Sequence, residues 1–151
     1  MVIIRAKINE LKVIGRITKR AYVIPYHEQG PAVGFYEDPL LKEKYENKEL
    51  GILAAKEKGK IIGTIRYRFP DKKNLYFFRL AVLKTHRKQG VGAKLVRAVE
   101  QLAKKHGCQK VLLDCMVEKG LVAYYQQLGY KVDKKKKHHD HHDAFMSKNL
   151  K

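Results

Sequence analysis

The sequence predicts an α+β fold, in which a mixed, mainly antiparallel sheet of about seven strands is flanked by about four helices. The main observation is the order of periodicities along the chain: strand, two helices, three strands, helix, strand, helix, two strands. A second observation is the length of 151 residues, which suits one domain, 1–151, and shows no internal repeat. We therefore expect a single sheet with helices packed against it.

Short elements and turns make up the first half of the chain. Apolar residues predict a strand over 3–6, and their helical spacing predicts a helix over 9–22. Residues 23–38 contain prolines and glycines without periodicity, which predicts a loop. A second short helix is predicted over 39–47, with Pro39 near its start, Asp38 as its N-cap, and Leu41 and Tyr45 facing the core.

Strand patterns follow from residue 50 onward. Residues 50–57 and 60–69 predict a hairpin that turns at Lys58 and Gly59, and residues 70–74 predict the next turn. Alternating residues from Tyr76 to Val82 predict a strand that leads directly into a glycine-containing turn.

The second half of the chain is predicted from the same signals. They indicate a helix over 92–106 ended by Gly107, a buried strand over 110–116, and a helix over 121–128 ended by Gly129. Two short strands, over 130–134 and 144–148, complete the sheet and are joined by a charged connection.

Composition narrows the class of protein. The net charge of +18 attracts polyanions, but the charges are scattered, which favours a solvated surface over a nucleic-acid site. No apolar run approaches the roughly 20 residues that span a bilayer, and the first residues lack the apolar stretch of a signal peptide. We therefore expect a cytoplasmic protein without a membrane partner. Of the two cysteines, Cys115 is expected to be a small buried residue.

A basic turn with two glycines, residues 87–93, connects a strand to a long helix. Gly90 and Gly92 leave room for a ligand to approach the backbone, and the first N–H groups of a helix carry partial positive charge. The turn therefore predicts a pyrophosphate site. It is not a dinucleotide fingerprint, because Leu95 stands where the third glycine would be. A Walker loop is excluded because no Ser or Thr follows Lys94.

The pattern Arg-x-x-Gly-x-Gly at Arg87, Gly90 and Gly92, after a Leu-Ala-Val strand end, resembles the GNAT superfamily of acyl-CoA-dependent N-acyltransferases. Residues 124–130, Tyr-Tyr-Gln-Gln-Leu-Gly-Tyr, are similar to the aromatic-Tyr-x-x-x-Gly-aromatic segment of that family. The resemblance covers most of the chain and implies the GNAT fold, with acetyl-CoA as cosubstrate. It implies that these residues bind the cofactor: Leu80, Ala81, Val82, Arg87, Lys88, Gln89, Gly90, Val91, Gly92 and Ala93.

Tyr125 is the predicted general acid, because a phenol with a pKa near 10 stays protonated at pH 7 and can donate to the departing thiolate. The sequence does not single out one general base, because the strand before the turn contains no carboxylate where some family members have a glutamate. Glu118 is the candidate, at a position where the family often has asparagine. Asp114, His86 and a water chain are the alternatives.

An amine acceptor is predicted to approach the 23–38 loop, where Tyr26, His27, Tyr36 and Glu37 offer aromatic walls and an acid. The tract 138–143 contains four histidines and two aspartates. In an extended hairpin His139 and His141 would face one way, with His138, Asp140 and His142 facing the other. Because the tract lacks a spaced ligand pattern, no metal is assigned.

The sequence thus predicts an N-acetyltransferase in which a primary amine attacks acetyl-CoA directly in a ternary complex. The alternative is a non-catalytic GNAT-like module that binds nucleic acid through its basic surface. The sequence leaves open the acceptor, the acyl-chain length and the oligomeric state, a homodimer included.

Overall fold

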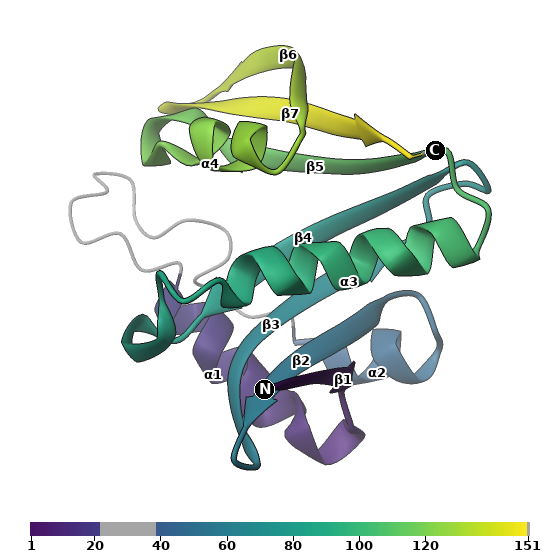
Figure 1. The fold of residues 1–151 in the computed structure, drawn as a ribbon, viewed down its shortest axis with the longest axis vertical. Coiled ribbons are helices and arrows are strands. Elements are labelled where there is room, and N and C mark those ends of the chain that lie inside the picture. Colours follow the sequence, from purple (N-terminus) through teal and green to yellow (C-terminus); the bar gives the residue numbers. More distant parts are fainter. Residues whose placement is uncertain (22–38, 151) are drawn as a thin grey trace. The chain divides into compact units, whose positions relative to one another are not determined.

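The computed structural model describes residues 1–21 and 39–150. They form a seven-stranded mixed sheet with the strand order β1-β2-β3-β4-β5-β7-β6 (Figure 1). β4 and β5 pair in parallel, whereas β1 with β2, β2 with β3, β5 with β7, and β6 with β7 pair antiparallel. The predicted α+β fold class is confirmed.

The elements follow the predicted order. The strands are β1 Val2–Arg5, β2 Gly51–Glu57, β3 Lys60–Arg68, β4 Asn74–Val82, β5 Lys110–Met116, β6 Lys131–His138 and β7 His141–Asn149. The helices are α1 Leu11–Ala21, α2 Leu41–Glu46, α3 Val91–Lys105 and α4 Leu121–Gln127. Two compact units share these elements: Met1–Arg68 with Arg79–Val99, and Phe69–Phe78 with Glu100–Lys151. No helix among the described residues is long and apolar enough to cross a bilayer.

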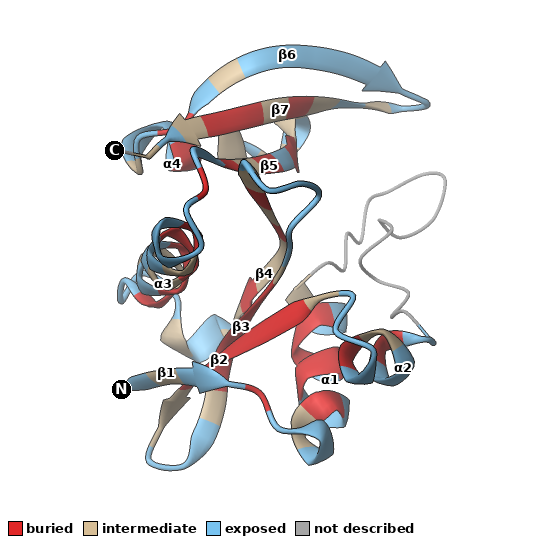
Figure 2. Cartoon of the chain, turned by 90° about the vertical axis from the view of Figure 1, so that its right-hand side faces the viewer, coloured by how far each residue is buried: buried red, intermediate tan, exposed pale blue. Residues whose placement is uncertain are grey.

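In the first unit, the centres of β2 and β3 are buried (red in Figure 2) because helices cover both faces. α1 lies on one face, where Arg66 Nη2 of β3 donates to Thr18 Oγ1 at 3.3 Å. The first half of α3 lies on the other face, against Gly63. A Cβ atom at Gly63 would come within 3.1 Å of Val91 Cγ1 and 3.2 Å of Leu95 Cδ1. Glycine at this position therefore lets α3 approach the sheet closely.

Two local expectations for the first unit have different outcomes. The predicted hairpin between β2 and β3 is confirmed, with Lys58 and Gly59 at φ values of 51° and 79°, the left-handed pair of a tight turn. The predicted N-cap of the second helix is wrong: Leu40 precedes α2 and makes no side-chain cap, while Asp38 lies outside the described residues. The helix is held instead by its buried face, where the Tyr45 hydroxyl donates to the Ala6 carbonyl.

In the second unit, β5 has the predicted bounds, and the expected burial of this strand is found on one of its two faces only. Val111, Leu113 and Cys115 are buried, whereas Asp114 on the other face is exposed. Burial raises the pKa of the Cys115 thiol to about 11, with further increases from the nearby carboxylates. The pKa of Cys108 is also raised by burial. Both thiols are free, and the expectation that Cys115 is a small buried residue is confirmed.

The last two strands are longer than predicted. Residues 135–138, expected to belong to a charged connection, continue β6 and pair in register with β7. Lysine has a low strand propensity, but the ladder to β7 and an exposed position outweigh it. The turn consists only of His139 and Asp140, so His138 and His141 stand opposite each other, with ring centroids 5.4 Å apart. The predicted alternation of the histidines is therefore wrong, because the turn interrupts it.

Candidate active site

The glycine turn of the first unit has the backbone conformation of a ligand cradle. After β4, a short 3-10 turn covers Lys84–His86, and the Leu83 N–H donates to the Ile62 carbonyl at 2.9 Å, which attaches the turn to β3. Lys88 and Gly90 then adopt left-handed φ values of 63° and 81°. A Cβ atom at Gly90 would meet nothing within 4 Å, so glycine is needed there for its backbone angle and leaves the space above the turn open.

The turn presents a set of free backbone donors. The first cap bond of α3 runs from the Lys94 N–H to the Gly90 carbonyl at 3.0 Å. Within the described part of the chain, the N–H groups of residues 88–93 donate to no backbone carbonyl. Together with the partial positive charge of a 15-residue helix, these donors suit a phosphate group. The structure thus brings the predicted cofactor residues 87–93 together in one turn.

The strand end before the turn contains a feature that the sequence did not indicate. Arg79 has a left-handed φ of 53° within β4, which a non-glycine residue adopts at a cost of about 1–2 kcal/mol. Ala81 is buried, whereas Leu80 and Val82 are half-buried. The Val82 carbonyl accepts a hydrogen bond from Arg87 Nε at 3.1 Å, so the turn's arginine is tied back to the strand end. Strained backbone of this kind is frequent at binding sites.

Tyr125 lies in the second unit, within a cluster of aromatic rings. It is buried on α4, with its ring 5.9 Å from that of Phe77 on β4 and 6.2 Å from that of Tyr130. The Tyr125 carbonyl accepts hydrogen bonds from the N–H groups of Leu128 and Tyr130, both at 3.0 Å. The backbone and the ring of Tyr125 are therefore both held in place.

A buried polar network fixes the segment after Tyr125. Glu100 of α3, only 8% exposed, accepts from the Tyr130 hydroxyl at 2.7 Å and from Lys148 Nζ at 3.2 Å. Lys148 also donates to the Leu128 carbonyl at 2.9 Å. Burial, followed by the bond to Glu100, raises the pKa of Tyr130, so this hydroxyl stays a donor. Sequence reasoning missed Glu100, although a carboxylate inside the apolar stripe of a helix was a visible signal.

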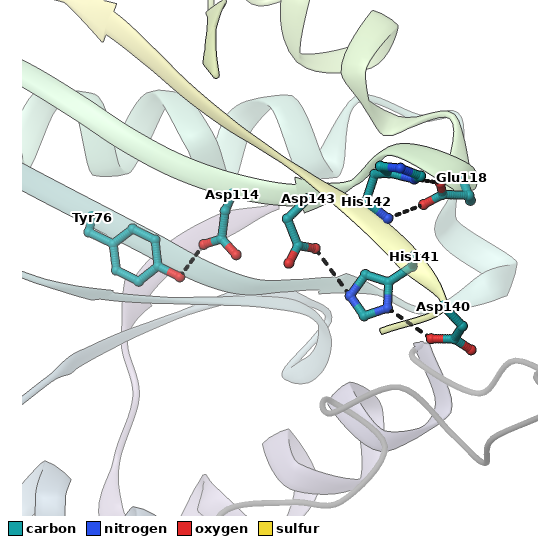
Figure 3. Close-up of polar contacts among 7 residues, drawn as sticks. All are labelled: Tyr76, Asp114, Glu118, Asp140, His141, His142 and Asp143. Atoms are coloured by element: carbon teal, nitrogen blue, oxygen red, sulfur yellow. Dashed lines mark hydrogen bonds and ion pairs between the residues drawn. The ribbon is translucent and has the colours of Figure 1, made fainter. Parts of the chain in front are cut away.

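Glu118, the base candidate, is held by His142 at the start of α4. Its carboxylate accepts the His142 backbone N–H at 2.8 Å and lies 2.7 Å from His142 Nδ1 (Figure 3). These bonds, the backbone one first, lower the pKa of Glu118 to about 2 although the side chain is exposed. A carboxylate with so low a pKa is a weak proton acceptor, and its bonds join the start of α4 to β7.

The alternative bases have their own partners. Asp114 of β5 accepts from the Tyr76 hydroxyl at 2.5 Å (Figure 3). Asp143 of β7, which is not one of the predicted bases, lies 3.4 Å from His141 Nε2. His86, in the first unit, lies 3.9 Å from the Glu57 carboxylate.

No group of three or more metal-ligating side chains occurs within residues 1–21 and 39–150. The predicted acceptor residues Tyr26, His27, Tyr36 and Glu37 lie outside the described residues.

Comparison with known proteins agrees with this fold. Residues 14–130 match the model of the acetyltransferase (GNAT) family, and the chain belongs to that family. N-acetyltransferase 8 of Rattus norvegicus is 33% identical over 98 residues, which cover 60% of this chain and 44% of that relative. The chain therefore spans less than half the length of this relative.

Solved structures share the whole fold at low identity. The protein smu.2055 from Streptococcus mutans UA159 has a TM-score of 0.79 and 21% identity, with 100% of both chains covered. The structure of yncA from Salmonella typhimurium with its cofactor acetyl-CoA has a TM-score of 0.76 and 16% identity, covering 100% of this chain and 94% of that one. The architecture of this chain is thus that of GNAT acetyltransferases.

The buried network makes a prediction about stability. Replacing Lys148 with Met leaves Glu100 without its cation, and we expect a loss of about 1–3 kcal/mol in the free energy of unfolding by urea. The double variant Glu100→Gln, Lys148→Met should recover part of this loss, because the uncompensated charge is gone. Lys131→Met, on an exposed strand position, is the control. Equal effects at Lys131 and Lys148 would show that the network contributes nothing.

The pair of Glu118 and His142 makes a prediction about pH. Because the pKa of Glu118 is lowered from 4.5 to about 2 in the folded protein, its stabilising effect is present above pH 4.5 and is lost as the pH falls toward 2. The 13C shift of its carboxyl carbon should titrate near pH 2. In His142→Ala the midpoint should rise only part of the way, since the backbone N–H remains. A midpoint near 4.5 in the unmodified protein contradicts the pairing.

Proposed function

We propose that this protein is an N-acetyltransferase that transfers the acetyl group of acetyl-CoA to a primary amine by direct attack in a ternary complex. The observation that carries the proposal is the turn over residues 88–93, at the start of a long helix, whose N–H groups have no backbone acceptor among residues 1–21 and 39–150. Such a turn suits a pyrophosphate. Membership of the GNAT family and a structural relative solved with acetyl-CoA support the same cosubstrate.

Acetyl-CoA supplies an activated thioester, and the residues of the chain supply binding and proton transfer. In the proposal, residues 88–93 hold the pyrophosphate, and the backbone of residues 80–82 aligns the pantetheine arm. The amine nitrogen forms a bond to the acetyl carbon as the bond from that carbon to sulfur breaks. Tyr125 gives its hydroxyl proton to the departing sulfur, and the amine proton leaves to a base.

Tyr125 suits the acid because rings and backbone bonds restrict its position. For the base, the low pKa of Glu118 makes this carboxylate a weak acceptor of the amine proton, whether it acts directly or through a water molecule. Asp114, which accepts a hydrogen bond from Tyr76, is the competing carboxylate. The acceptor itself is proposed to approach by way of residues 23–38, which lie outside the described residues.

Calorimetric titration with acetyl-CoA tests the cofactor proposal. Gly90→Asp adds a negative charge where the pyrophosphate is proposed to bind, and we expect its affinity to fall about tenfold to a hundredfold. Gly107→Asp is a matched control, since Gly107 is also exposed, left-handed at φ 76° and free of neighbours within 4 Å. If the intact protein binds no acetyl-CoA, the proposal fails and the nucleic-acid-binding alternative gains support.

Steady-state kinetics test the acid. In Tyr125→Phe, kcat should fall about a hundredfold while the KM for acetyl-CoA changes little, because the proton is needed only as sulfur departs. The loss should shrink with an acetyl donor whose leaving thiol has a lower pKa. Tyr124→Phe, next to it and 36% exposed, should keep its rate. Similar rates for both variants would remove Tyr125 from the mechanism.

A further inference from the structure

The outer strand of the second unit has an unusual concentration of charge. β6 ends the strand order, and beyond it the described residues contribute no further strand. Five of its eight residues are lysines, and all five are exposed. The strand therefore combines a free backbone edge with dense positive charge.

The lysines occupy both faces of the strand. After the irregularity between Val132 and Lys134, consecutive residues pair with β7 in regular register. Lys135 and Lys137 stand opposite Ala144 and His142, whereas Lys134 and Lys136 stand opposite Phe145 and Asp143. Lysines on the same face are about 6.6–6.8 Å apart, because side chains alternate along a strand. Positive charge thus runs along both sides of one backbone edge.

These charges are not neutralised within the described parts of the chain. Lys131 and Lys135 to Lys137 form no ion pair or hydrogen bond with another described residue, and Lys134 lies 5.1 Å from the centroid of the Phe145 ring. Two carboxylates of neighbouring segments have other partners, since Asp143 faces His141 and Glu118 is bound by His142. Asp133 is the one acidic residue within β6, so lysines outnumber carboxylates five to one along the strand. The edge is therefore available to an external anion.

The position of the charges on β6 limits the kind of molecule that can bind there. A second copy is a poor fit, because two β6 edges would place lysine against lysine and the opposite edge strand, β1, offers Val2, Ile4 and Arg5. A nucleic-acid site would be expected to include aromatic side chains among the lysines, and β6 has none. An extended peptide that adds as a strand can reach both faces at once.

We propose that β6 is a docking edge for an extended acidic peptide segment of a partner protein. The peptide backbone pairs with the free edge of β6, and its carboxylates stand opposite the lysines on each face. The lysines would serve specificity in two ways, because they attract an acidic strand and repel a second β6.

Fluorescence anisotropy with the chain of residues 1–151 tests this proposal. The probe is a short labelled peptide in which glutamate fills most positions, with threonine and valine in the others. We expect binding that weakens with salt and falls about tenfold or more in Lys135→Glu, Lys137→Glu. Lys134→Glu, Lys136→Glu should weaken it similarly, because an added strand contacts both faces. The same charge change on α3, Lys104→Glu, Lys105→Glu, is the control.

A second peptide, N-methylated at alternate residues on the edge-facing side, separates strand addition from simple charge attraction. It should lose binding although its charge is unchanged. Equal binding of the methylated peptide, an equal loss in the α3 control, or no binding at low salt would each overturn the proposal. Tighter binding of an RNA oligonucleotide than of the peptide would also overturn it and make the strand a nucleic-acid surface.

Discussion

The close approach of α3 to β3 at Gly63 is the constraint on which the first unit depends. Because no side chain stands at Gly63, Val91 and Leu95 pack directly against the strand, and Val91, the first residue of the helix, is only 4% exposed. The start of α3 is therefore fixed at a buried residue, and the residues just before it are left in solvent. Lys88 and Gly90 have left-handed backbone and so do not extend the helix, and in the described part of the chain the N–H groups of residues 88–90 have no backbone partner. Packing thus defines the position of the glycine turn.

Much of the fold could be predicted because apolar periodicity and glycine positions are strong local signals. The hairpin at Lys58 and Gly59, and the helix that follows the glycine turn, are examples. The length of β6 could not be predicted in the same way, because lysine has no strand preference of its own. Its conformation depends on pairing with β7, which is a contact between distant residues. The left-handed backbone conformation of Arg79 could not be predicted either, because the alternation of apolar and polar residues carries no information about a single backbone angle.

The parts of the candidate site that depend on neighbouring residues could also be predicted from the sequence, whereas the parts that depend on distant contacts could not. The glycine turn over residues 87–93 depends on glycines, helix geometry and basic residues that adjoin in sequence, so the sequence alone could predict which residues form it. The partner of Glu118 lies 24 positions away in the sequence, and the two partners of Glu100 lie 30 and 48 positions away, so the contacts of these carboxylates could not be predicted from local sequence. Hydrogen bonds from His142 determine how basic Glu118 is, and those contacts exist only in the folded chain.

The state of the two cysteines has a practical consequence for measuring turnover. Thiol reagents attack the thiolate, and a thiol with a pKa of about 11 is ionised in only about one molecule in a thousand at pH 8. Cys108 and Cys115 are both buried as well, so each is shielded from a dye in solution. A chromogenic disulfide added to a reaction mixture would therefore react very slowly with the protein's own thiols. Any free coenzyme A released during catalysis could be followed continuously, with little background from the enzyme.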